Sequence, residues 1–184
     1  MQRFLRAVGA RFDDLALRPF EAGDAVATPW PALRDWCLAD LPAAPWSVAC
    51  HAGPDRVLPM RRAGALALEL DGTHRLQACS GALGRLQLRL AVKWQDAQFS
   101  RPAQAGDVWD SGAVPDTQSA WQALARFEPR RPTFIVIQGA MEAGLAQALA
   151  TLGNRGVGFA KPVRVLVLAG DGQAPLPGAT CIPA

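Results

Sequence analysis

Two histidines are the side chains in this sequence best suited to acid–base chemistry near neutral pH. His51 and His74 each lie in or beside a predicted turn, with Asp55 and Asp71 nearby in the sequence. An imidazole in such a place can act as a general base, for example toward a ribose hydroxyl. No serine lies in a G-x-S-x-G elbow, and neither histidine belongs to an H-E-x-x-H motif. Both histidines are therefore catalytic candidates whose simpler interpretation is a surface or hydrogen-bonded turn residue.

A second set of candidates follows two predicted apolar strands. Gln138 is the last residue of the segment TFIVIQ, and Gly139 lies in the turn that follows it. Asp171 lies between two glycines directly after the segment VRVLVLA. Ligands in open α/β sheets lie at the carboxyl ends of strands, where free backbone amides can bind an anion. Arg155, in the glycine-dense segment GNRGVG, could add charge to such a site. The chain has neither a G-x-G-x-x-G nor a Walker A pattern, so ordinary turns and a helix C-cap explain the same residues.

The cysteines do not form a metal or redox motif. Cys37, Cys50, Cys79 and Cys181 are widely separated, and none belongs to a C-x-x-C pair. A site made from them and the histidines would need ligands from four distant segments. The acidic residues within 107–116 match no EF-hand spacing. We predict no structural metal, no cofactor and four reduced thiols.

The middle third of the chain is its basic part. Residues 56–101 carry eight Arg or Lys and three Asp or Glu, although the whole chain has a net charge of only +3. The segment RLQLRLAVKW at 85–94 alternates apolar and polar residues with the period of a half-buried strand. Four basic residues then share an outward sheet face: Arg75, Arg85, Arg89 and Lys93. This face is predicted to bind a partner.

An acidic protein surface is the partner that the basic face favours. Guanidinium groups suit carboxylates and phosphates alike, so their chemistry does not decide between a protein and a nucleic acid. Single-strand RNA readers add exposed aromatic side chains for base stacking. The outward positions of the 85–94 segment carry no aromatic residue, which favours a protein.

The spacing of apolar residues predicts the elements that would position these side chains. Helices are expected over 1–17, after Pro31 and over 118–127, and a strand over 46–50. Alternation and turn signals predict a three-strand antiparallel meander from the segments 65–70, 74–79 and 85–94. Two apolar strands and a helix over 133–169 predict a β-α-β unit, after a long connection over 102–117.

The predicted fold class is therefore α+β (mixed α/β), with one mixed sheet in a single domain over 1–184. Its parts are a helical N-terminal part (1–55), antiparallel strands (56–101), a helix plus the β-α-β unit (118–170) and an extended tail (171–184). With 50% hydrophobic residues in 184, the chain can form one core. No apolar run approaches the roughly 18 to 20 residues of a membrane span. The first residues lack the order of a secretion signal, so a cytoplasmic location is expected.

These patterns favour a non-enzymatic protein-interaction module, such as an adaptor, accessory subunit or inhibitor of a larger bacterial-type assembly. One alternative is an RNA-binding or RNA-processing protein that uses the basic face, with His51 or His74 in a nuclease. A second alternative is a small-molecule enzyme with its site at the strand ends near Gln138 and Asp171.

Overall fold

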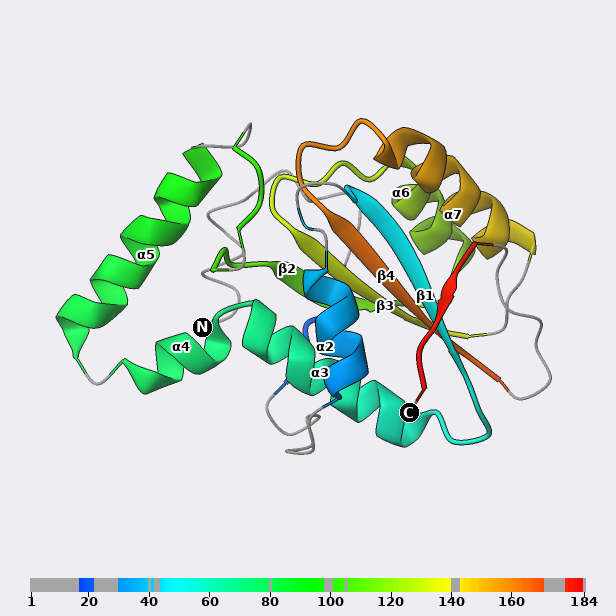
Figure 1. Ribbon diagram of the computed structural model, residues 1–184, viewed down its shortest axis with the longest axis horizontal. Coiled ribbons are helices and arrows are strands. Elements are labelled where there is room, and N and C mark those ends of the chain that lie inside the picture. The colour runs from blue at the N-terminus through cyan, green and yellow to red at the C-terminus, as the bar shows by residue number, and fades with distance from the viewer. Residues whose placement is uncertain are drawn as a thin grey trace.

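The described part of the chain, in a computed structural model, contains one five-stranded sheet (Figure 1). The described residues are 17–21, 30–39, 41, 44–79, 81–97, 101–104, 106–139, 143–170 and 178–183. The strands are β1 (Trp46–Ala52), β2 (Asp110–Val114), β3 (Thr133–Gln138), β4 (Val163–Ala169) and β5 (Thr180–Cys181). They lie in the order β2-β3-β4-β1-β5, and every neighbouring pair is parallel.

Strand β4 is the central element of this sheet. All seven of its residues are buried, and it pairs along its length with β1 on one side and β3 on the other. Successive parallel strands need crossover connections, which place helices on the faces of the sheet. The strands of such a sheet are buried on both faces and read as continuous apolar runs. The segments VRVLVLA of β4 and TFIVIQ of β3 have this composition.

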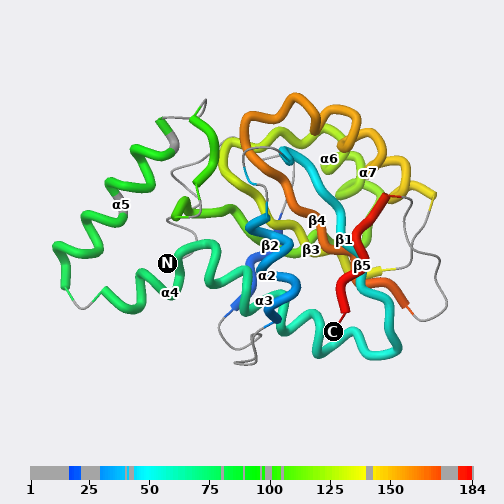
Figure 2. The backbone as a smooth tube through the Cα atoms, viewed as in Figure 1, coloured from blue at the N-terminus to red at the C-terminus, as the bar shows by residue number. Residues whose placement is uncertain are grey.

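Two layers of helices cover the two faces of the sheet (Figure 2). The helices are α2 (Pro31–Leu38), α3 (Val57–Leu70), α4 (Thr73–Ala78), α5 (Ala82–Ala97), α6 (Gln118–Arg126) and α7 (Ala143–Gly156). Helices α2 and α3 pack on one face in a core that includes Leu33, Leu68 and Leu166. Helices α6 and α7 pack on the other face, where Leu149 and Val165 belong to a second core. Within the described part of the chain, no helix has the length and hydrophobicity of a membrane span.

The predicted fold class is wrong. The antiparallel meander over 56–101 does not exist, because the segments 65–70, 74–79 and 85–94 lie in helices α3, α4 and α5. These segments are rich in Ala, Leu, Arg and Gln, which favour helices, and poor in the β-branched residues that favour strands. Gly72, which lies between two of the predicted strands, has a φ of 76° and separates Asp71, the C-cap of α3, from the first residue of α4. The sheet is also not mixed, since all five strands are parallel.

Other predicted elements are present or fall outside the description. The β-α-β unit over 133–169 consists of β3, α7 and β4, and its two strands pair in parallel. The long connection over 102–117 contains β2, which the prediction missed, and β2 forms an edge of the sheet. The predicted helix over 1–17 lies outside the described residues except for Leu17. The predicted tail over 171–184 is described only at 178–183, where β5 pairs with β1.

A buried arginine joins α2 to the central strand. Arg164 is 1% exposed, although it lies within the apolar run of β4. Its guanidinium donates hydrogen bonds to the carbonyl oxygens of Ala44 (2.7 Å), Ala39 (3.0 Å) and Cys37 (3.3 Å). The last carbonyl groups of a helix have no partner within the helix, so Arg164 supplies donors to the end of α2 and the chain beyond it.

We expect the substitution Arg164→Met to lower the free energy of unfolding by about 3 kcal/mol, because it leaves buried carbonyl groups without donors. Urea denaturation of the variant and the parent measures the difference. The matched control is Arg126→Met on the exposed side of α6, which should change the value by less than about 0.5 kcal/mol. Equal stability of Arg164→Met and the parent would contradict this role.

The thiols should differ sharply in reactivity. Burial raises the pKa of the Cys37 thiol far above its usual range, and the charge of Arg164 opposes this only in part. Because the thiolate is the reactive form, Cys37 should resist iodoacetamide until the protein unfolds, whereas the exposed Cys181 should react first. Mass spectrometry of peptides at successive times measures the order. Labelling of Cys37 as fast as Cys181 in the folded protein would contradict it.

Candidate functional site

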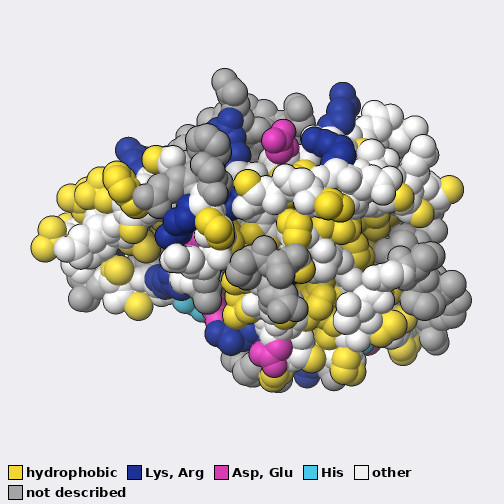
Figure 3. Space-filling model, turned by 45° about the horizontal axis from the view of Figure 1, so that its top comes forward, with side chains coloured by type: hydrophobic (Ala, Val, Ile, Leu, Met, Phe, Trp, Pro, Cys, Tyr) yellow, Lys and Arg dark blue, Asp and Glu magenta, His cyan; other side chains and the backbone are white. Residues whose placement is uncertain are grey.

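Helix α5 carries a row of large apolar side chains that face solvent. Leu83, Leu86, Leu90 and Trp94 recur at spacings of three and four, so they lie on one side of the helix. They are 69%, 51%, 56% and 68% exposed, respectively. We call these four residues the α5 stripe. Figure 3 shows hydrophobic side chains gathered over this helix, at the left of the view, with basic side chains beside them.

The opposite side of α5 holds the helix on the rest of the protein. Val92 is buried, and so is Gln95. The side-chain amide of Gln95 donates to the carbonyl oxygen of Val108 (2.9 Å), and its amide oxygen accepts from the Val108 backbone N–H (2.9 Å). This pair of hydrogen bonds occurs just before β2. The helix is therefore attached near its C-terminal end with the α5 stripe turned outward.

The predicted basic residues are distributed differently from the sequence-based expectation. Arg85, Arg89 and Lys93 lie in α5 at spacings of four, so they form a ridge along one helix beside the α5 stripe. Arg85 and Lys93 are exposed, and the Arg89 side chain lies outside the description. Arg75 lies on α4, where it donates to the carbonyl oxygen of Gly106 (2.7 Å). The four residues therefore share no sheet face, and we call Arg85, Arg89 and Lys93 the basic ridge.

The predicted ligand residues lie at two different ends of the sheet. Gln138 and Gly139 are at the carboxyl end of β3, as expected. A Cβ at Gly139 would come within 2.5 Å of Asp116 Oδ2, so the Asp116 carboxylate lies directly against this glycine. Arg155 is in the last turn of α7 and donates to the carbonyl oxygens of Ala125 (3.0 Å) and of Phe127 (3.4 Å), at the end of α6.

Arg155 is thus separated from Gln138 and Gly139. Helix α7 begins after the carboxyl end of β3 and runs back toward the start of β4. Its last turn therefore lies at the end of the sheet where β3 and β4 begin. Asp171 lies outside the described residues. Only Gln138 and Gly139, of the four predicted ligand residues, are therefore placed together.

The two histidines are on different elements. His51 is the penultimate residue of β1, where its Nδ1 lies 3.0 Å from the carbonyl oxygen of Ile182 and its ring packs edge-on against Trp30. A carbonyl oxygen only accepts, so Nδ1 carries the proton of this hydrogen bond. This contact joins the chain after β5 to β1. His74 is exposed on α4, and the described side chains of His, Cys, Asp and Glu include no group that could hold a metal ion.

The start of α3 is occupied by a side chain of the protein itself. In a phosphate-binding loop, a strand leads through a glycine-rich turn into a helix whose first amides bind the phosphate. Here Asp55 Oδ1 accepts from the backbone N–H of Val57 (2.8 Å) and of Leu58 (3.4 Å). The carboxylate of Asp55 therefore caps the first turn of α3, at the position that a phosphate occupies in a phosphate-binding loop.

Comparisons of the chain with protein-family models, curated proteins and solved structures found no match.

The α5 stripe is the feature that sequence analysis missed. Its signal is present in the spacing of Leu83, Leu86, Leu90 and Trp94, but the two-residue alternation across 85–94 was assigned to a strand.

We expect Gln95→Ala to loosen α5 without unfolding the sheet. The change removes both hydrogen bonds to Val108, including the partners of two backbone groups. Amide hydrogen exchange over 82–97 should become at least about tenfold faster, while exchange in β3 and β4 stays slow. Gln87→Ala, at an exposed position of the same helix, is the control. Equal exchange in the two variants would show that Gln95 does not anchor α5.

Proposed function

We propose that this protein is a non-enzymatic interaction module that binds a partner protein through α5. The α5 stripe is the observation that carries this proposal. Single exposed apolar side chains are ordinary, but contiguous exposed apolar patches typically mark interaction sites. The four residues lie along one helix, and two of them are more than two-thirds exposed.

The spacing of the α5 stripe fits a helix that enters an apolar groove. Such helices present anchors at positions i, i+3, i+7 and further turns to the groove of the partner. Fully burying a leucine contributes roughly 1.5 to 3 kcal/mol relative to leaving it exposed. Tryptophan is enriched among the residues that dominate binding energy, which favours Trp94 as the strongest anchor of the α5 stripe.

The charge of α5 favours a groove with an acidic rim. The helix contains the three bases of the basic ridge and one acid, Asp96. Carboxylates along one side of the groove would complement the basic ridge and steer association. A second copy of this chain would bring an equally basic helix to the interface, so like charges disfavour self-association through α5. The acidic protein partner predicted from the sequence is thus retained, on a helix in place of a sheet.

The alternatives have less support. An RNA-binding reading would need several aromatic side chains for base stacking, whereas the α5 stripe has one aromatic residue and three leucines. A nuclease would need a second catalytic side chain beside one of the histidines, and the His51 ring is hydrogen-bonded to the chain after β5. We keep the cytoplasm as the predicted compartment.

Position-specific photocrosslinking in the natural host cell tests this proposal. A photoreactive phenylalanine derivative replaces Leu90 in the α5 stripe, and in a matched strain it replaces the exposed Gln122 of α6. We expect position 90, and not position 122, to crosslink one protein at an apolar segment bordered by Asp and Glu, identified by mass spectrometry. Leu86→Glu in the same chain should reduce the crosslink at least about tenfold, because it places a charge in the groove.

Other crosslinked products would overturn the proposal. A crosslink from position 90 to a second copy of this chain would identify α5 as a self-association surface. A crosslink to RNA would establish the nucleic-acid alternative, and recovery of lipid adducts would indicate a membrane surface. Equal crosslinking to one protein from positions 90 and 122 would show that α5 has no special role.

A further inference from the structure

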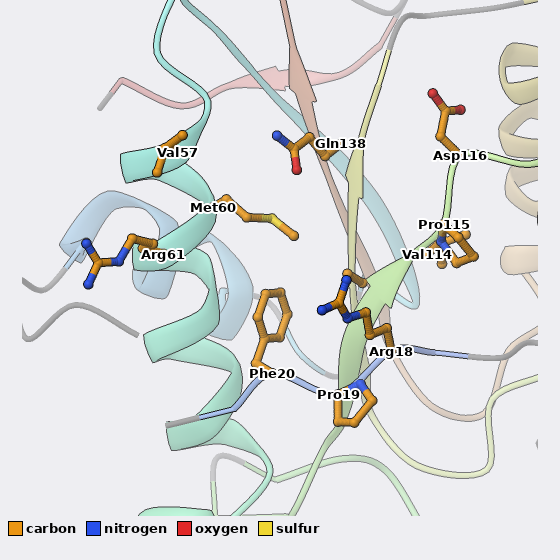
Figure 4. Close-up of a pocket in the computed structure, with 11 residues that line it drawn as sticks. Arg18, Pro19, Phe20, Val57, Met60, Arg61, Val114, Pro115, Asp116 and Gln138 are labelled. Carbon is orange, nitrogen blue, oxygen red and sulfur yellow. The ribbon is translucent and has the colours of Figure 1, made fainter. Parts of the chain in front are cut away.

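A pocket lies at the carboxyl edge of the sheet, on elements other than α5. It has a volume of about 550 Å³ and lies between the first turns of α3, the carboxyl ends of β2 and β3, and the segment 18–20. In Figure 4, Arg18, Phe20, Met60 and Gln138 point toward one another across it. Pockets of this size hold small organic ligands, and the carboxyl edge is where ligands bind open α/β sheets.

The pocket presents polar groups that the chain itself does not use. Gln138 is the one exposed residue of β3, and its amide faces Met60 across the cavity. Arg18 bonds to Ala113 through its backbone only. Within the described part of the chain, no hydrogen bond or ion pair occupies the side chains of Arg18, Arg61 or Gln138. Arg18 and Gln138, which face the cavity in Figure 4, can therefore donate to a ligand.

The charges around the pocket favour an anion. Arg18 lines it with its guanidinium turned toward Phe20, whereas the side chain of Arg61 on α3 points away from it in Figure 4. The one lining carboxylate, that of Asp116, lies against Gly139 and points away from Met60 in Figure 4. A carboxylate or phosphate would thus meet the guanidinium group of Arg18, and this group binds both with forked hydrogen bonds.

The rest of the lining suits an apolar body. The ring of Phe20, the thioether of Met60 and the side chain of Val57 form the walls on the α3 side. Methionine adapts to the shape of a bound group and makes favourable contacts with aromatic rings. The start of α3 does not compete for the anion, because Asp55 already occupies its first amides.

We propose that this pocket binds a small organic anion with an aromatic or other apolar body. The anionic group pairs with Arg18 and accepts from the Gln138 amide, and the apolar body packs against Phe20 and Met60. This site is independent of partner binding through α5.

Methyl NMR of the full-length protein labelled at methionine with carbon-13 tests the site. The chain has three methionines, and the Met60 signal is assigned by its loss in Met60→Leu. Benzoate, phenyl phosphate and the neutral benzamide are titrated separately. We expect benzoate or phenyl phosphate to shift the Met60 signal with a dissociation constant in the millimolar range, as befits their size. Benzamide, which has the same ring without the charge, should bind at least about tenfold more weakly.

Two variants make the test specific. Arg18→Gln should weaken binding of the anion at least about tenfold, whereas Arg126→Gln, which removes an exposed charge on α6, should leave it unchanged. An unchanged thermal melting temperature in both variants shows that the fold is intact. Preference for benzoate identifies a carboxylate site, and preference for phenyl phosphate identifies a phosphate site. Equal binding of benzamide, equal affinity in Arg18→Gln, or no shift of the Met60 signal would overturn the proposal.

Discussion

The parallel pairing of β1 with β4 is the constraint on which the rest of this structure depends. Residues 46–52 align in register with residues 163–169, although more than a hundred residues separate them in the chain. Parallel neighbours cannot be joined by a tight hairpin, so the intervening chain must cross the faces of the sheet as helices. β4 is consequently covered on both sides, and its one charged residue, Arg164, is tolerated because its guanidinium serves the carbonyl groups at the end of α2.

The crossover from β1 to β2 is longer than the sheet requires, and its extra length forms α4 and α5. Figure 1 shows α5 apart from the sheet, where Val92 and Gln95 hold it by one side. A helix with a buried side and a second apolar side has more hydrophobic surface than its own fold can cover. The α5 stripe therefore makes the helix suited to binding outside the chain, and the basic ridge beside it narrows the choice of partner.

The carboxyl edge of the sheet combines close packing with unused polar groups. Two strand ends carry glycines against which charged side chains lie, Asp116 on Gly139 and Arg56 on Gly170. Asp55 satisfies the first amides of α3, so a phosphate cradle of the usual loop type does not form there. The polar groups that remain, on Arg18 and Gln138, face an apolar cavity. The edge is thus arranged for a ligand held by side chains.

The sequence by itself determined the elements whose periodicity has one interpretation. The apolar runs of β3 and β4, the helix between them, the helix after Pro31 and the helix α6 follow from local patterns. The segment 85–94 did not, because leucine at every second position satisfies a strand face and also both sides of a helix. Only the tertiary structure decided that β2 joins the sheet and that α5 exposes one apolar side. Those outcomes depend on contacts between distant segments, such as Gln95 with Val108 and β2 with β3, which local spacing does not encode.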